Sequence, residues 1–218
     1  MGLFRSKKTP IFDMNKFNVC LKTAGIRTTA VINKKRSVNS QKRREIAILL
    51  DQEKFELARI QVEAVIRDDV YASAYEIIYN FLQLVTSRSH VVEREQFVPT
   101  NLLEALTTIV WSAPYSEIKE LQDLRDQLGY KYGNEFIQDS LTNKLETVNP
   151  KVISKLSMTT PPMSVVQTYL ESIAKQYNVV CPEPEPEISP LQPIAPASVA
   201  VNDYGLDDLA ERFNKLNE

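Results

Sequence analysis

The chain has 218 residues, of which 43% are hydrophobic, and its formal net charge at pH 7 is −2. This length is sufficient for one buried core with a terminal segment outside it. No apolar run approaches the ~20 residues that cross a bilayer, and the N-terminus lacks the apolar stretch of a signal peptide. Cys20 and Cys181 lack metal-binding or redox spacing, so we expect free thiols and a cytoplasmic protein, peripheral on a membrane.

The small net charge conceals a strong asymmetry along the chain. The first 44 residues contain 12 Lys or Arg and one acidic residue, Asp13, whereas the rest contains 14 basic and 27 acidic residues. A dense basic arm is typical of a surface that binds phosphate groups of lipids or of nucleic acid, although a solvated helix face has the same pattern. We assign membrane binding to eight of its residues: Lys7, Lys8, Lys34, Lys35, Arg36, Lys42, Arg43 and Arg44.

The first half of the chain contains very few helix breakers. No proline occurs from Ile11 to Val98, and no glycine from Ile26 to Leu128. Apolar residues recur there at spacings of three and four, which is the period of a helix with one buried face. The pattern predicts two long helices, over residues 13–50 and 52–96, that a tight turn folds into an antiparallel hairpin.

Shorter helices are expected after Pro99, which makes the predicted fold class all-α. Ser116 is expected to cap one helix that ends at Leu128, with Gly129 in the left-handed position beyond it. Asn149 is expected to cap a helix that begins at Pro150, and Pro161 or Pro162 to open the last. The expected set comprises residues 101–111, 116–128, 134–143, 150–156 and a helix from about 161 to 177.

The C-terminal region has a different composition. Six prolines interleave with glutamates over residues 181–196, which predicts an extended acidic linker. A short helix is expected beyond it, marginal alone and therefore dependent on a partner groove, with Arg212 fixing its register against an acidic partner. The alternative is a tail that docks on its own core. The apolar face of this helix comprises Leu206, Leu209, Phe213 and Leu216.

These patterns divide the chain into four expected parts. They are a basic N-terminal segment (1–11), a helical core (12–180), an acidic proline-rich linker (181–202) and a helical binding motif (203–218).

Sequence signals of catalysis, metal binding or cofactor binding are weak. His90 is the only histidine, without cysteine or acidic neighbours at ligand spacing, and is expected on a helix surface. Asp68 and Asp69 are adjacent on a helix and do not face one another. No phosphate loop, dinucleotide fingerprint or nucleophile elbow occurs. We therefore expect no enzymatic activity, no cofactor and no metal.

Several runs, taken in order, resemble one known family. Their order makes the resemblance more specific than any single run. They include Arg-Arg-Glu-Ile-Ala-Ile-Leu-Leu at 43–50, Ile-Arg-Asp-Asp at 66–69, Trp-Ser-Ala-Pro at 111–114, Lys-Tyr-Gly-Asn-Glu-Phe at 131–136 and Tyr-Leu-Glu-Ser-Ile-Ala-Lys-Gln-Tyr at 169–177. This set is similar to the increased sodium tolerance family, whose members are related to the ESCRT-III membrane-remodelling subunits.

The resemblance implies an ESCRT-III-like helical core without enzymatic activity. It also implies partners, namely other ESCRT-III subunits, with which the chain forms a polymer, and the AAA ATPase of vacuolar protein sorting. The implied process is endosomal sorting at multivesicular bodies. Residues 209–216 are similar to a motif that binds MIT domains, but Phe213 stands where leucine is usual and Asn217 where a basic residue is usual.

Two further expectations concern the basic arm. Gly2 and Ser6 fit the N-myristoylation pattern, with Lys7 and Lys8 as the second, electrostatic signal, although Leu3 and Phe4 could equally insert unmodified or cap the core. The alternative function is a helical nucleic-acid-binding protein. Residues 22–44 contain no aromatic side chain to stack on bases, so we expect an anionic membrane as the partner and no nucleic acid.

Overall fold

The computed structural model describes residues 11–157 and 160–181, and every regular element in this part is helical. These residues belong to one compact unit, Met1–Pro182. The all-α prediction is therefore confirmed. The elements are α1 (Met14–Asp51), α2 (Phe55–Ser87), α3 (Ser89–Arg94), the 3₁₀ turn η1 (Thr100–Leu102), α4 (Leu103–Ser112), η2 (Ala113–Tyr115), α5 (Lys119–Thr142), α6 (Pro150–Leu156) and α7 (Met163–Tyr177).

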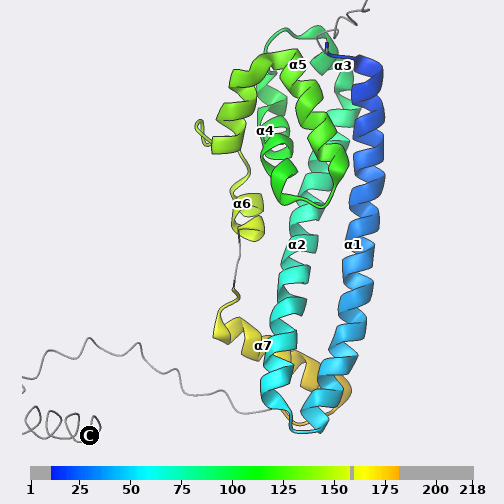
Figure 1. The fold of residues 1–218 in the computed structure, drawn as a ribbon, viewed down its shortest axis with the longest axis vertical. Helices are drawn as coiled ribbons and strands as arrows, with labels where there is room; N and C mark the ends of the chain where they lie inside the picture. The colour runs from blue at the N-terminus through cyan, green and yellow to red at the C-terminus, as the bar shows by residue number, and fades with distance from the viewer. Residues whose placement is uncertain (1–10, 158–159, 182–218) are drawn as a thin grey trace, which may run out of the picture. The chain divides into compact units, whose positions relative to one another are not determined.

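Helices α1 and α2 form the predicted antiparallel hairpin (Figure 1). Asp13 caps α1, because its carboxylate accepts hydrogen bonds from the backbone N–H groups of Asn15 (2.9 Å) and Lys16 (3.1 Å). The second helix is shorter than expected. It ends at Ser87, where the hydroxyls of Thr86 and Ser87 donate to carbonyls of the last turn and so favour an end to the helix.

Helices α4 and α5 pack beside the half of the hairpin that is far from its turn (Figure 1). The main apolar cluster lies between these four helices and includes Phe17 of α1, Tyr75 of α2, Leu106 of α4 and Leu124 of α5. Trp111, expected in the core, is 7% exposed. This packing fixes α5 along one side of α1.

Two glycines of α5 have roles other than the one predicted. The helix does not end at Gly129 but continues to Thr142, with a kink at Gly133, whose φ of 90° favours glycine. A Cβ at Gly129 would lie 3.3 Å from Ile137 Cγ1, so Gly129 allows the segment after the kink to pack closely. Ser116 does not cap the helix either, because its hydroxyl accepts from Ile118 N–H, one residue before α5 begins.

The last two helices begin as the sequence predicted. Asn149 caps α6, accepting from Lys151 and Val152 N–H at 3.1 and 3.2 Å, and Pro162 precedes α7. Helix α7 lies against both hairpin helices near the turn that joins them (Figure 1). There its apolar face forms a second cluster with the hairpin, which comprises Ile46, Ala47, Leu50, Ala58, Val62, Val65, Ile66, Val166, Leu170, Ile173 and Ala174.

Candidate interaction surfaces

Most of the basic residues predicted on α1 face acidic residues of α2. Asp68 accepts from Lys35 and from Lys42, each at 3.0 Å, and Asp69 pairs with Arg43 at 2.8 Å. All five side chains are between 13% and 32% exposed. The carboxylates therefore neutralise much of the positive charge that the sequence places on this stretch of α1.

A buried amide completes this polar layer of the hairpin. Asn39 is 2% exposed, and its side-chain amide donates to the backbone carbonyl of Val65 at 3.0 Å and to Asp69 Oδ1 at 2.7 Å. The amide nitrogen is satisfied only in this alignment of the two helices, which favours the alignment, whereas the buried Oδ1 has no hydrogen-bond partner in the described structure. Asn39 thus fixes the register of the hairpin.

Lys35 also reaches the segment that precedes α5. Its Nζ lies 3.0 Å from a Glu117 carboxylate oxygen, and it stands over the Tyr71 ring, 5.7 Å from the centroid. Burial alone would lower the pKa of Lys35, but hydrogen bonds with Glu117 and Asp68 raise it above its usual value. Lys35 therefore joins three segments as a cation.

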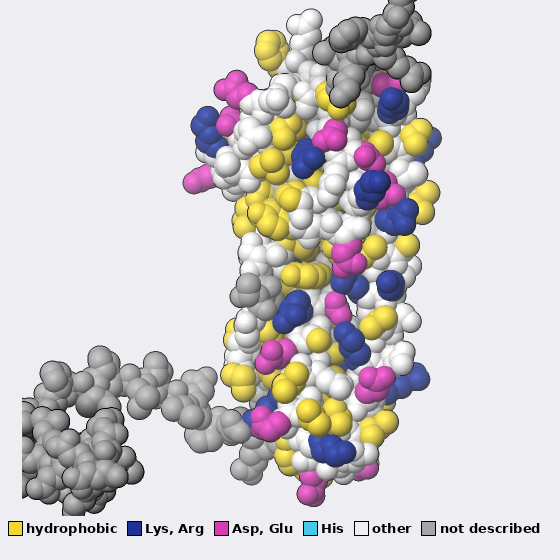
Figure 2. Space-filling model, in the orientation of Figure 1, with side chains coloured by type: hydrophobic (Ala, Val, Ile, Leu, Met, Phe, Trp, Pro, Cys, Tyr) yellow, Lys and Arg dark blue, Asp and Glu magenta, His cyan; other side chains and the backbone are white. Residues whose placement is uncertain are grey.

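The remaining basic residues differ in their exposure. Arg36 pairs with Glu76, and both side chains are largely exposed, so this pair contributes little to stability. Lys34 and Arg44 are exposed and have no ion-pair partner among residues 11–157 and 160–181. Lys7 and Lys8 lie outside the described residues. Figure 2 shows acidic, basic and hydrophobic side chains interspersed on one face of the molecule.

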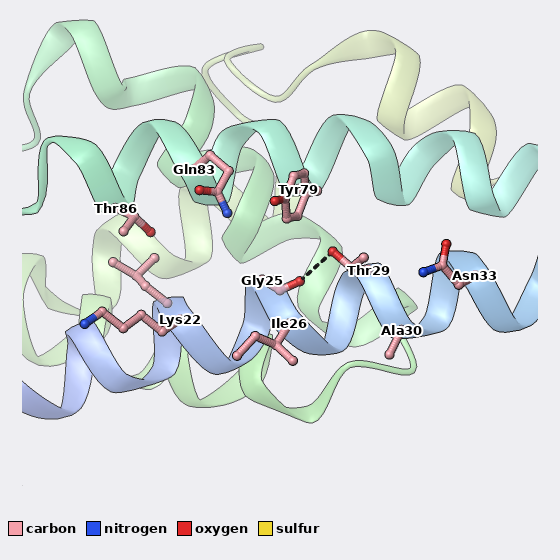
Figure 3. Close-up of a pocket in the computed structure, with 10 residues that line it drawn as sticks. Lys22, Gly25, Ile26, Thr29, Ala30, Asn33, Tyr79, Gln83 and Thr86 are labelled. Carbon is pink, nitrogen blue, oxygen red and sulfur yellow. Dashed lines mark hydrogen bonds between the residues drawn. The ribbon is translucent and has the colours of Figure 1, made fainter.

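A shallow groove runs between α1 and α2 on the side shown in Figure 3. Its volume is about 590 Å³, and Tyr79, Gln83 and Thr86 of α2 point toward its α1 wall. The α1 wall contains the small residues Gly25, Thr29 and Ala30 among larger ones. Thr29 donates to the Gly25 carbonyl at 3.1 Å and so keeps its hydroxyl on its own helix.

A second groove, which we call the α1–α5 groove, has a volume of about 540 Å³. Burial, followed by the negative charges of Asp123 and Glu120, raises the pKa of the Cys20 thiol, which lines the groove. The α5 wall of the groove is therefore electronegative. The lining residues are Ile11, Asn15, Lys16, Val19, Cys20, Asp123, Asp126, Gln127 and Tyr130.

Several predicted site residues lie outside the described residues. They are Gly2 and the tail residues Leu206, Leu209, Arg212, Phe213 and Leu216. Within the described ranges, His90 is exposed on α3, and no group of three or more His, Cys, Asp or Glu residues could hold a metal ion. No described helix has the length and apolarity that crossing a membrane requires.

The family model of Ist1, described as the regulator of Vps4 activity in the MVB pathway, matches residues 18–180. The IST1-like protein of Dictyostelium discoideum is 33% identical over 170 residues, which are 78% of this chain and 46% of that protein. The vacuolar protein sorting-associated protein IST1 of Saccharomyces cerevisiae is 30% identical over 173 residues, 75% of this chain and 58% of that protein. The chain thus spans about half the length of these relatives.

A solved structure agrees with the sequence comparisons. It is the crystal structure of the S. cerevisiae Ist1 N-terminal domain in complex with the Did2 MIM motif. Its TM-score is 0.74 at 28% identity, and the match covers 83% of this chain and 100% of that chain. The long hairpin, the shorter packed helices and the matched residues 18–180 lead to one conclusion: the chain belongs to the Ist1 family, whose core has an ESCRT-III-like helical fold.

Proposed function

We propose that this protein is a non-enzymatic ESCRT-III-like subunit that regulates a Vps4-type AAA ATPase in the multivesicular body pathway. The observation that carries the proposal is the family match over residues 18–180, which includes both apolar clusters of the described core except Phe17. The expected location is the cytoplasmic face of endosomal membranes, where the protein binds peripherally.

In this proposal, residues 203–218 recruit the ATPase. Four apolar side chains fill a groove of its MIT domain, and Arg212 fixes the register by pairing with an acidic residue of that domain.

The experiment is fluorescence anisotropy of a labelled 203–218 peptide with the MIT domain. Leu216→Ala should weaken binding by about 1 to 3 kcal/mol, because one apolar anchor is lost. Asn214→Ala, outside the apolar stripe of the helix, is the matched control. Equal binding of all three peptides would contradict this role.

The helical core is proposed to bind other ESCRT-III subunits and to polymerise with them. Support comes from the related S. cerevisiae Ist1 N-terminal domain, whose structure was solved with the MIM motif of Did2. The polar layer around Asn39 and the ion pairs of α1 with α2 give the hairpin the fixed shape that a repeating subunit requires.

Membrane binding is proposed to depend on the basic residues of α1 that α2 leaves unpaired. Lys34 and Arg44 are exposed, whereas Lys35, Lys42 and Arg43 are held by carboxylates. Each exposed cation near an anionic surface contributes about 1 kcal/mol. Lys7 and Lys8 are proposed to add to this attraction.

A lipid at Gly2 is proposed as a further anchor. A single myristoyl chain gives only marginal attachment, so it would act together with the basic residues. Intact mass of protein produced with an N-myristoyltransferase tests the modification. An unmodified N-terminus would instead leave Leu3 and Phe4 as an apolar insertion.

The regulatory role is tested by the ATPase rate of the Vps4-type enzyme in the presence of the full chain. The rate should change with added protein, and Leu216→Ala should reduce the change at equal protein concentration while leaving the fold intact. An ATPase rate that does not respond to the full chain would overturn the proposal.

Preferential binding to oligonucleotides over phosphatidylserine vesicles at equal ionic strength would favour the nucleic-acid alternative.

A further inference from the structure

A small polar pocket lies where the end of α7 meets the middle of α1. Its volume is about 260 Å³, and we call it the α1–α7 pocket. Helix α1 contributes Arg36, Ser40 and Arg43, whose spacings of four and three place them on one face of the helix. Helix α7 contributes its last two residues, Gln176 and Tyr177. The pocket is therefore built from two helices that are far apart in the sequence.

Two arginines give this pocket a positive side. Arg43 is held in place, because Asp69 lies 2.8 Å from one of its nitrogens and the Tyr169 ring centroid lies 5.7 Å from its guanidinium carbon. Arg36 pairs with Glu76, but both side chains are largely exposed, so this pair costs little to break. A guanidinium has five N–H donors and binds two phosphate oxygens at once. Both arginines thus have donors left for a phosphate group.

Three other side chains of the pocket have unused hydrogen-bonding groups. The hydroxyls of Ser40 and Tyr177 and the amide of Gln176 form no hydrogen bond within residues 11–157 and 160–181. Ser40 and Gln176 are also exposed to solvent. Hydroxyl and amide groups both donate and accept. A ligand in the pocket therefore meets partners for its donors as well as for its acceptors.

A buried oxygen beside the pocket lacks a hydrogen-bond donor. Asn39 lines the pocket and is 2% exposed, and its Oδ1 has no partner in the described part of the chain. A buried acceptor without a donor is costly, so a ligand hydroxyl next to it would be stabilising. The Asp69 carboxylate also lines the pocket. A simple anion would meet this carboxylate and would leave Oδ1 unsatisfied, so the fitting ligand has hydroxyl groups in addition to its negative charge.

We propose that the α1–α7 pocket binds a phosphorylated polyol, a compound in which a phosphate monoester stands beside free hydroxyl groups. The phosphate accepts hydrogen bonds from Arg36 and Arg43, and the hydroxyls pair with Asn39 Oδ1 and with Gln176. Soluble inositol phosphates and the headgroups of phosphorylated inositol lipids share this chemistry. The site goes beyond the membrane contact proposed above and does not depend on it.

Such a ligand connects α7 to the hairpin. Its phosphate partners belong to α1, whereas Gln176 and Tyr177 belong to α7. A ligand that binds only while both helices are in place stabilises that arrangement, and the effect increases with its concentration. Bound ligand therefore holds α7 against α1.

Isothermal titration calorimetry of the full chain with inositol 1-phosphate tests the site. Inorganic phosphate lacks the ring hydroxyls, and inositol lacks the phosphate. Each should therefore bind at least about tenfold more weakly than inositol 1-phosphate. No saturable binding of inositol 1-phosphate, or equal binding of inorganic phosphate, would overturn the proposal.

Substitutions at the rim of the pocket locate the binding. Arg36→Gln with Gln176→Ala should weaken binding of inositol 1-phosphate at least about tenfold, because a guanidinium and an amide are lost. Both residues are exposed, so the double variant should keep its fold. The control is Arg67→Gln with Gln61→Ala, which makes the same changes at exposed positions of α2 outside the pocket. Equal effects of the two double variants would exclude this pocket.

Hydrogen exchange tests the connection between the helices. At about 100 times its Kd, inositol 1-phosphate should slow exchange of the α7 amides by up to about 100-fold, because α7 must release the ligand before it opens. Exchange at the α4 amides serves as the comparison, since α4 packs in the other apolar cluster. Unchanged exchange of α7 at saturating ligand would overturn the proposed site.

Vesicles distinguish the two sources of the ligand. Co-sedimentation with phosphatidylinositol 4-phosphate vesicles is compared with that on phosphatidylserine vesicles of equal total charge. A preference for the inositol lipid that Arg36→Gln with Gln176→Ala removes would support the pocket and identify a lipid headgroup as its ligand. Equal co-sedimentation, together with binding of inositol 1-phosphate, would support the pocket as a site for the soluble compound.

Discussion

Lys35 Nζ and Asp68 Oδ1 lie 3.0 Å apart and join the two long helices at the polar layer of the hairpin. Asp68 also accepts from Lys42, so one carboxylate compensates two partly buried ammonium groups. Lys35 in turn contacts Glu117 before α5. The stability of the hairpin and the position of α5 are therefore linked through this pair.

Asp68→Ala should lower the free energy of unfolding by about 1 to 3 kcal/mol, because it leaves Lys35 and Lys42 without their shared partner. Urea denaturation followed by circular dichroism measures the change. Glu76→Ala is the control, since it breaks the exposed pair with Arg36 and should cost less than about 1 kcal/mol. Equal losses of unfolding free energy for the two variants would mean that the partly buried network contributes no more stability than the exposed pair.

The contribution of Asp68 should disappear in acid. Burial alone would raise the pKa of this carboxyl, but hydrogen bonds from Lys35 and Lys42 and their charges lower it below its usual value. A group whose pKa is lower in the folded state than in the unfolded state stabilises the fold fully at a pH above its unfolded pKa, about 3.9. This stabilisation is lost as the pH falls through the folded-state pKa. The difference in urea midpoint between wild type and Asp68→Asn should therefore be constant from pH 5 to 7 and shrink below about pH 4. A difference that grows in acid would contradict this sign.

Leu170→Ala should loosen α7 without unfolding the rest of the core. Leu170 is fully buried in the cluster at the hairpin turn, and loss of such a side chain costs about 2 to 5 kcal/mol. Hydrogen exchange at the α7 amides should become faster, while that of α4 and α5 stays unchanged. Thr168→Ala, exposed on the same helix, is the control. Faster exchange throughout the molecule would show instead that α7 and the main core unfold together.

Lys34→Glu with Arg44→Glu should reduce co-sedimentation with phosphatidylserine vesicles and leave the free energy of unfolding within about 0.5 kcal/mol of wild type. Both residues are exposed and unpaired in the described structure. Lys35→Glu with Lys42→Glu should reduce the stability as well, because Asp68 would then face two negative charges. Undiminished vesicle binding by the Lys34 and Arg44 double variant would mean that other residues form the membrane contact.

The sequence predicts the helices well where local rules decide them. The spacing of apolar residues and the Asn149-Pro150 pair each depend on a few neighbouring residues, and the structure agrees with them. The predicted end of the helix at Leu128 was wrong, because Gly129 allows a close contact with Ile137 that only the folded chain creates. Gly133, four residues later, has a positive φ of 90°, the sign expected at Gly129.

To predict the ion-pair partners of the basic residues, one must know how the two hairpin helices align. Adjacent on one helix, Asp68 and Asp69 do not face one another, and in the fold they face cations of α1 that lie about as far before the turn as they lie after it. The sequence therefore contains a signal for these ion pairs, since residues at similar distances before and after the turn of a hairpin lie opposite one another. The position of α7 offered no such signal, because its apolar face could fit any exposed stripe of the bundle.

The buried amide of Asn39 and the surrounding ion pairs separate the two apolar clusters of the hairpin. This polar layer provides little apolar packing between the two clusters. We therefore expect the cluster at the turn, with α7, to open and close while the cluster at the other end, and the α1–α5 groove beside it, stays folded.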